Sequence, residues 1–323
     1  MAKQGDAYKP SAATMRSRFV LEMAAGMGAG EEQVYREPEV RLNTLDGGGS
    51  PVNLSASSTL DGIEKVVGGA LDLAFLNPSA ALTVAYRGKG GTFTTPQPVC
   101  AVTVLPSRDQ CMFVVHGDTG LTHIEDIGRE KFPLKLSLRG REEHWLHNML
   151  DDIFAAAGFT LADLEAWGGE VRREGHIPRP GTPKFEALSR GEITALFDEG
   201  VHGWANEVTP AGMTVLKMGQ DTAGRLEEMG YRRDHLLKAR YPTLPEDILT
   251  LDFSGWPVFV HQDADDDLVR RICAGLEARK DAILWEGEGP LPLDRMCADC
   301  PEAPLDVPLH AAAERFWSER GYL

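Results

Sequence analysis

The sequence has little of what membrane proteins, disulfide-rich domains and nucleic-acid-binding proteins need. Its 323 residues contain no run of about 20 apolar residues, which excludes a transmembrane helix. The formal net charge of −16 leaves no excess of basic residues for binding nucleic acid or an anionic membrane surface. The five cysteines are an odd number, which makes a disulfide framework unfavourable.

Two short histidine and cysteine motifs lack the partners that a metal site requires. Cys297 and Cys300 form a C-x-x-C, but only His310 follows it, and zinc normally takes four ligands. His144 and His147 form an H-x-x-H, and a metal site would need at least a third ligand beside them. We therefore expect no metal, no cofactor and no disulfide.

The rest of the composition is that of an ordinary globular protein. The chain is 42% hydrophobic and 25% charged, and its length suits one large or two medium domains. Strand-like apolar runs at 71–77, 134–139 and 193–197 alternate with helical patterns such as that at 265–285. This alternation predicts an α/β fold with a largely parallel sheet.

The first 30 residues contain no apolar stretch with the length and flanks of a secretory signal. The sequence as it stands therefore favours a cytoplasmic protein. Removal of a signal would place the protein in the periplasm instead.

The order of motifs along the chain resembles that of one family of solute-binding proteins. The series is "DGGGSPVNL" (46–54), "GALDLAFLNPSAA" (69–81), "LKLSLRG" (134–140), "LSRGEITALFDEGV" (188–201) and "PLHAAAERFWSERGYL" (308–323). It is similar to the TAXI family of TRAP-transporter solute-binding proteins. The resemblance implies a type II periplasmic-binding-protein fold, in which two α/β lobes hold a small organic anion, often a carboxylate, in the cleft between them.

The resemblance also implies a division of the chain and a partner. Lobe I would comprise residues 1–130 and 251–323, and lobe II residues 131–250. The chain would cross between the lobes near residues 117–130 and 250–256. Besides its small-molecule ligand, a TRAP membrane component is the implied partner.

Candidate ligand residues in the first lobe lie in turns next to strands. Glycines allow backbone N–H groups to approach an anion, and an arginine can clamp a carboxylate. The alternatives are an ordinary turn, a helix cap and a surface hairpin arginine. The first-lobe candidates are Gly49, Ser50, Asn53, Asn77, Ser79 and Arg108.

Two dense polar segments supply the candidates of the second lobe, "RGREEH" (139–144) and "FDEGVHGW" (197–204). Both follow strands of the same predicted lobe, so we expect Arg139 and a helix N-terminus at 140–143 to face Asp198 and Glu199. A solvated helix start and a buried core tryptophan are the alternatives. The second-lobe candidates are Arg139, Gly140, Glu143, His144, Asp198, Glu199 and Trp204.

Two functions of different classes fit these residues. The first is a small-molecule receptor that closes two lobes around a carboxylate. The second is a cytoplasmic enzyme on the same fold, such as a decarboxylase of an aromatic carboxylate. In the enzyme, the acid and base would come from Asp198, Glu199, His144 and His202.

Overall fold

The computed structural model describes residues 12–28, 37–44, 49–57 and 60–323. The chain divides into two units, residues 1–39 and 40–323, which we describe separately. The first unit contains α1 (Ala12–Gly28), on which Met15, Phe19 and Met23 are exposed. No helix of the described residues is both long and apolar enough to cross a membrane.

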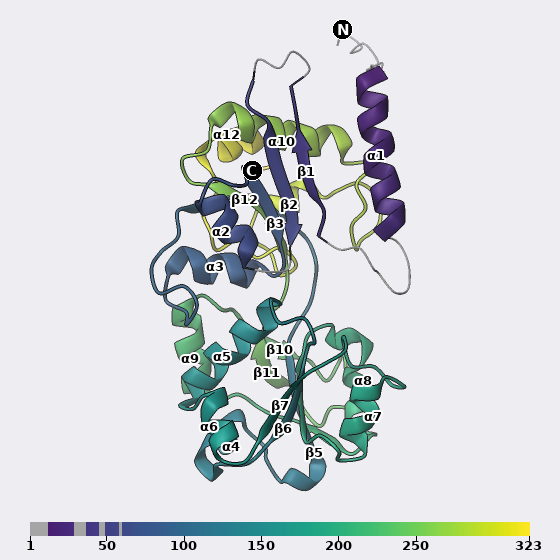
Figure 1. Cartoon of the computed structure of the whole chain (residues 1–323), viewed down its shortest axis with the longest axis vertical. Helices are drawn as coiled ribbons and strands as arrows, with labels where there is room; N and C mark the ends of the chain where they lie inside the picture. Colours follow the sequence, from purple (N-terminus) through teal and green to yellow (C-terminus); the bar gives the residue numbers. More distant parts are fainter. Residues whose placement is uncertain (1–11, 29–36, 45–48, 58–59) are drawn as a thin grey trace. The chain divides into compact units, whose positions relative to one another are not determined.

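The first sheet of the larger unit is mixed and has the strand order β1-β2-β3-β12-β4 (Figure 1). β2 runs parallel to β3, whereas β12 is antiparallel to both of its neighbours. The strands are β1 (Glu39–Leu42), β2 (Val52–Ser57), β3 (Leu73–Leu76), β4 (Val99–Leu105) and β12 (Trp256–His261).

The second sheet repeats this plan with the order β7-β6-β8-β5-β9. β6 is parallel to β7 and β8, and β5 is antiparallel to β8 and β9. Its strands are β5 (Met112–His116), β6 (Lys135–Leu138), β7 (Glu170–Arg173), β8 (Ala195–Asp198) and β9 (Met213–Val215). A separate antiparallel pair is formed by β10 (Arg233–Leu236) and β11 (Ile248–Leu251).

β5 in the second sheet and β12 in the first sheet run antiparallel to both of their neighbours. Each is the first strand that the chain adds to that sheet after it crosses from the other lobe. β5 follows β4 through residues 106–111, and β12 follows β11 through residues 252–255. The chain therefore has a two-lobed α/β fold of the type II periplasmic-binding-protein kind. We call the parts around the first and second sheets the first and second lobes.

The sheet pairing changes one detail of the division expected from the sequence. The first crossing lies at residues 106–111 and not at 117–130, because β5 pairs with β8 and β9. The division into lobe I (1–130 and 251–323) and lobe II (131–250) remains a prediction. The pairing of β5 would move the first boundary between the lobes to an earlier residue. The second crossing, at 252–255, lies within the expected segment.

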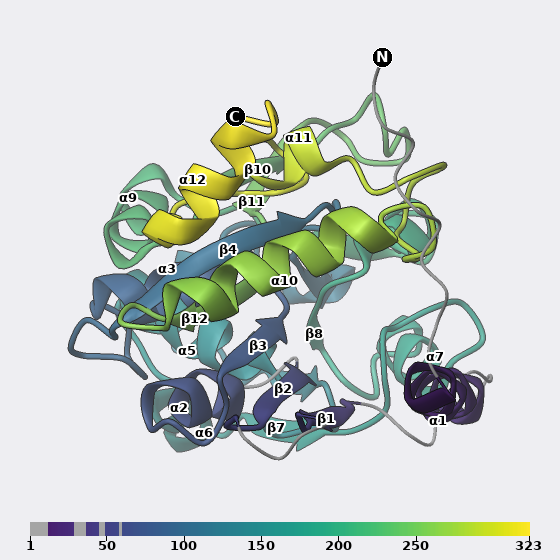
Figure 2. The ribbon, with the colours of Figure 1, turned by 90° about the horizontal axis from the view of Figure 1, so that it is seen from above.

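Helices flank both sheets, and Figure 2 shows α10 and α12 side by side over the first sheet. The helices of the first lobe are α2 (Asp61–Val67), α3 (Ser79–Arg87), α10 (Asp266–Arg279), α11 (Leu293–Met296) and α12 (Ala311–Glu319). Those of the second lobe are α4 (Ile124–Glu130), α5 (Trp145–Ala157), α6 (Leu161–Ala166), α7 (Pro183–Ser189), α8 (Ala205–Val208) and α9 (Gln220–Met229), with short 3₁₀ turns at Gly117–Thr119 and Val201–Gly203.

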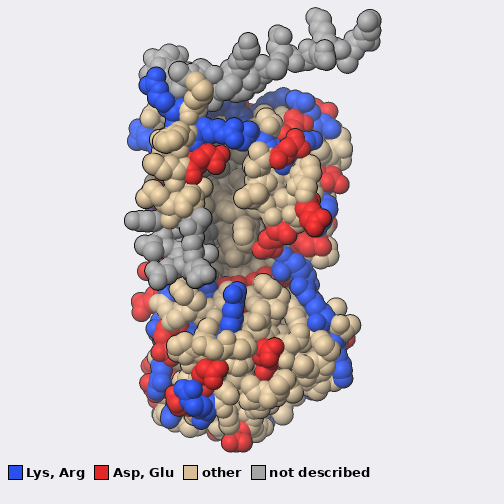
Figure 3. Space-filling view, turned by 90° about the vertical axis from the view of Figure 1, so that its right-hand side faces the viewer, with Lys and Arg blue, Asp and Glu red and all other residues tan. Residues whose placement is uncertain are grey.

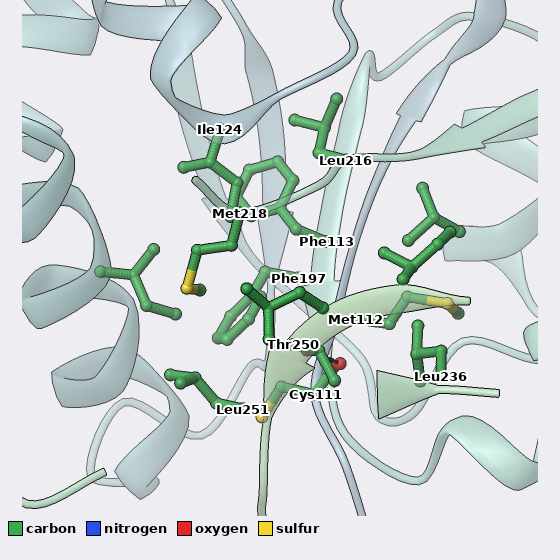
Figure 4. Close-up of a pocket in the computed structure, with 14 residues that line it drawn as sticks. Cys111, Met112, Phe113, Ile124, Phe197, Leu216, Met218, Leu236, Thr250 and Leu251 are labelled. Atoms are coloured by element: carbon green, nitrogen blue, oxygen red, sulfur yellow. Dashed lines mark hydrogen bonds between the residues drawn. The ribbon is translucent and has the colours of Figure 1, made fainter. Parts of the chain in front are cut away.

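The apolar core continues from one lobe into the other. A single cluster of buried side chains contains Ile63 and Leu76 of the first lobe together with Phe113, Leu136 and Ile153 of the second. A narrow gap of about 10 Å³ remains between the second sheet and the β10–β11 pair, lined mostly by apolar side chains (Figure 4). A gap of this size holds one water at most.

Candidate functional site

The strand register brings the carboxyl ends of both sheets to the two crossing segments. In the first sheet, Trp256 at the start of β12 pairs with Leu105 at the end of β4. In the second sheet, Met112 at the start of β5 pairs with Asp198 at the end of β8. Side chains that follow β3, β6 and β8 therefore gather around residues 106–111 and 252–255, as strand ends do in open α/β sheets.

Arg139 forms a buried ion cluster with two acids at this edge. It follows β6, while Asp198 ends β8 and Glu199 comes directly after it. The Arg139 guanidinium donates to Asp198 Oδ1 from both Nε, at 3.2 Å, and Nη2, and from Nη2 to Glu199 Oε1 at 2.5 Å. The predicted approach of Arg139 to these acids is thus confirmed. Arg139 is only 6% exposed and Asp198 is fully buried.

Two further side chains complete this cluster, and the sequence reasoning missed both. Lys184 of α7 is buried, donates to the Leu138 carbonyl at 2.9 Å, and lies 3.5 Å from Asp198 Oδ2. Asp109 of the first crossing accepts from the Gly200 N–H at 3.0 Å. A lysine in an amphipathic helix normally reads as solvent-exposed, so no sequence signal marked Lys184. Asp109 does stand next to the candidate Arg108 in "PSRDQ".

The buried Asp109 and Glu199 carboxyl groups form a hydrogen bond with each other, and their pKa values are shifted in opposite directions. Burial, together with a hydrogen bond to Glu199, raises the pKa of Asp109 to about 9. Burial opposes the charge on Glu199, yet its hydrogen bond with Asp109 and the Arg139 guanidinium lower its pKa overall.

His144 is buried beside the cluster and is held neutral. Burial and the Arg139 charge lower its pKa to about 3. Its Nδ1 accepts from the Leu146 N–H at 3.3 Å, which makes it the N-cap of α5 and leaves the proton on Nε2. The ring stacks on Phe253 of the second crossing at a centroid distance of 6.3 Å.

The helix expected to start at residues 140–143 starts later. α5 begins at Trp145, and the segment before it is a turn in which Gly140 and Glu143 are exposed. The Gly140 N–H donates to the Gly175 carbonyl at 3.0 Å. The prediction of a helix N-terminus at 140–143 is therefore wrong, because His144 provides the cap.

The first-lobe candidates separate into two groups. Gly49 and Ser50 are exposed in the β1–β2 connection, part of which (45–48) lies outside the described residues, and the Asn53 N–H donates to Asp72 at 2.7 Å. β2 and β3 are parallel, so this group lies at the opposite end of the sheet from the Arg139 cluster. The structure does not bring these three residues to the crossing segments.

Asn77 and Ser79 do lie at the carboxyl end of β3. The Ser79 N–H donates to the carbonyl groups of Ser254 and Gly255 in the second crossing, at 3.1 and 2.8 Å. Ser79 is 3% exposed, and neither its hydroxyl nor Asn77 Oδ1 has a hydrogen-bond partner among the described residues. Buried polar atoms of this kind normally have a partner, so these two can serve a ligand or an ordered water.

Arg108 is tied into the junction of the two crossings. It donates to Asp252 Oδ1 at 2.7 Å, to Ser254 Oγ at 3.0 Å and to Asp234 Oδ2 at 2.5 Å. It borders an open pocket of about 310 Å³, whose wall also contains Arg232, Arg233, Asp234, Asp252 and Asp299. Arg108 therefore connects the first crossing segment to the second through Asp252 and Ser254, and to β10 through Asp234.

The remaining aromatic and histidine candidates lie elsewhere. Trp204 is 1% exposed in the core of the second lobe, where its indole N–H donates to the Glu199 carbonyl at 3.2 Å. It therefore supports Glu199 through the backbone and offers no face for stacking. His202 is exposed and stands in the 3₁₀ turn after Glu199.

The structure also bears on metals and charge. The five cysteines are all within the described residues and all have free thiols. The described part of the chain contains no cluster of three or more side chains suited to hold a metal ion. On the face seen in Figure 3, basic and acidic side chains of the second lobe are interspersed among uncharged surface.

Comparison with known proteins gives distant structural matches only. No protein-family model and no curated protein sequence matches the chain. A structure described as Tv2483 bound to L-arginine is 11% identical with a TM-score of 0.30, covering 67% of this chain and 63% of the other. An ancestral arginine-binding protein bound to arginine is 11% identical (TM-score 0.31; 68% and 70% covered), and a TctC solute-binding protein from Polaromonas is 13% identical (TM-score 0.31; 68% and 66% covered). The chain thus spans less than two thirds of the first of these proteins.

Proposed function

We propose that this chain binds a small organic molecule at the edge where the two sheets meet, with the Arg139 cluster as the polar centre of the site. The single observation that carries the proposal is the burial of Arg139 between Asp198 and Glu199 at the ends of β6 and β8. Ligand sites of open α/β folds lie at such strand ends. Membership of the TAXI family would add a TRAP membrane component as the partner.

The charges of the cluster suggest how a carboxylate ligand could be accommodated. The cluster combines two basic side chains, Arg139 and Lys184, with three carboxyl groups, those of Asp198, Glu199 and Asp109, and burial raises the pKa of Asp109. A ligand carboxylate would compete with Glu199 for the guanidinium, and a displaced Glu199 that takes up a proton from solvent would keep the total charge of the site unchanged. A ligand hydroxyl or amino group would be accepted by the same acids.

Native mass spectrometry of freshly purified protein tests this proposal. We expect a retained small molecule, and we expect Arg139→Lys to lose it, because an ammonium group cannot reproduce the planar guanidinium contacts. The matched control is Arg172→Lys, since Arg172 pairs with Glu170 on the exposed edge strand β7. Equal retention by both variants would contradict a role for Arg139.

One specific observation favours the alternative function, an enzyme on the same fold. The Asp109 and Glu199 carboxyl groups are hydrogen-bonded to each other, have pKa values shifted in opposite directions, and lie beside the Arg139 guanidinium, which is an arrangement suited to general acid–base chemistry. His144 and His202 fit that role less well, because one is a neutral helix cap and the other is exposed. Turnover of the retained molecule by the parent chain, with loss in Glu199→Gln, would favour the enzyme.

A further inference from the structure

The two lobes touch at a second place, away from the crossing segments and from the Arg139 cluster. In Figure 1, α3 of the first lobe lies directly above α5 and α9 of the second. The Arg87 guanidinium on α3 donates to the Glu227 carbonyl of α9 at 2.8 Å. A Cβ built on Gly230, just after α9, would lie 3.2 Å from the Val84 backbone nitrogen, so the two elements are in close approach.

The carboxylate of Asp152 lies at the centre of this junction. Asp152 is on α5 and is 3% exposed. Its Oδ1 accepts from the Gly91 N–H of the first lobe at 2.8 Å, and its Oδ2 accepts from the Tyr231 hydroxyl at 2.7 Å. One side chain thus holds the loop 88–98 of the first lobe and the segment that follows α9 in the second.

Neighbouring contacts join the same two surfaces. Asn148, one turn before Asp152 on α5, donates from Nδ2 to Thr92 Oγ1 at 2.7 Å. Phe93 of the loop is 7% exposed and belongs to the apolar cluster that continues into the second lobe. A Cβ on Gly91 would lie 3.0 Å from Asp152 Oδ1, so the backbone of the loop sits directly against the carboxylate.

We propose that Asp152 is the centre of a latch that fastens the first lobe to the second along the α3–α5–α9 edge. The lobes are then fixed both at the crossing segments and at this edge. The latch uses none of the residues assigned to ligand binding, so its test does not depend on the proposed function.

Hydrogen exchange of the ligand-free chain tests the latch. In Asp152→Ala, we expect the amides of the loop 88–98 to exchange at least tenfold faster, while the amides of β3 and β8 keep the parent rate. The matched control is Asp151→Ala, the exposed aspartate one position earlier on the same helix, which should leave exchange in the loop unchanged. Small-angle scattering should show a larger radius of gyration for Asp152→Ala than for Asp151→Ala.

Three results would overturn the latch. They are a parent-like exchange rate of the loop in Asp152→Ala, an equal acceleration of β3 and β8, and faster loop exchange with an unchanged radius of gyration. If Asp152→Ala does not fold, Asn148→Ala serves instead, because it removes only the exposed hydrogen bond to Thr92. We expect a roughly threefold faster exchange confined to the loop in that variant, and no change would count against the proposal.

Discussion

Removal of the Arg139 side chain should destabilise the folded chain strongly. In Arg139→Ala, Asp198 and Glu199 lose the cation that donates to both of them in a site where Arg139 itself is only 6% exposed. Breaking a buried pair by removing one partner typically costs about 3–5 kcal/mol. Lys184, 3.5 Å from Asp198, offsets part of this loss, so we expect about 3 kcal/mol, the lower end of that range.

Urea unfolding monitored by circular dichroism measures this loss. The matched control is Arg172→Ala, since Arg172 and its partner Glu170 are 38% and 50% exposed and such pairs contribute about 0–1 kcal/mol. Arg139→Lys should lie between the two, because it keeps the charge and loses the planar donors. An Arg139→Ala chain that is as stable as Arg172→Ala would refute the argument that this cluster is a buried, mutually dependent set.

Further expectations concern the neighbours of the cluster. Asp109 has its folded-state pKa raised to about 9, so the stability that it contributes is complete below about pH 4 and is lost as the pH rises through 9. The unfolding free energy of the parent chain should therefore decline from about pH 5 to 9. In urea titrations, Asp109→Asn should make this decline less steep. An unchanged slope would show that the pKa of Asp109 is not raised. Trp204→Ala should cost about 3–5 kcal/mol in the same assay, because it empties a fully packed core position, and a loss below about 1 kcal/mol would contradict its core role. His202→Ala, at an exposed position, should change the unfolding free energy by less than about 0.5 kcal/mol and leave ligand retention in native mass spectrometry intact; loss of the ligand would restore His202 as a site residue.

The sequence predicted the second-lobe site better than the first. Arg139, Asp198 and Glu199 follow strands of the same sheet, and a parallel arrangement brings strand ends together, so their contact could be inferred. Their burial could not be inferred, because charged residues after a strand usually remain in solvent.

For the first-lobe candidates, the sequence did not reveal at which end of a strand each residue lies. Gly49, Ser50 and Asn53 precede or begin β2, whereas Asn77 and Ser79 follow β3. Only the second pair lies at the carboxyl edge, and the run "DGGGSPVNL" does not reveal at which end of a strand it stands. β5 and β12 each follow a crossing segment and pair with strands that are distant in the sequence. No local sequence pattern encodes such pairing.

Trp204 and His144 show how tertiary contacts decide between two readings of one residue. A tryptophan after a polar turn can stack on a ligand or fill a core. The hydrogen bond from the Trp204 indole N–H to the Glu199 carbonyl fixes this side chain in the core. A histidine at a helix start can be an acid, a ligand or a cap. The bond from the Leu146 N–H to its Nδ1 makes it a cap, with the ring stacked on Phe253.

A crystal structure of the chain with its retained molecule tests the central claim most directly. We predict that a polar group of that molecule lies within hydrogen-bond distance of the Arg139 guanidinium or the Glu199 carboxyl group, at the ends of β6 and β8. Binding in the pocket beside Arg108 and Arg232, with the Arg139 cluster unchanged, would contradict the account.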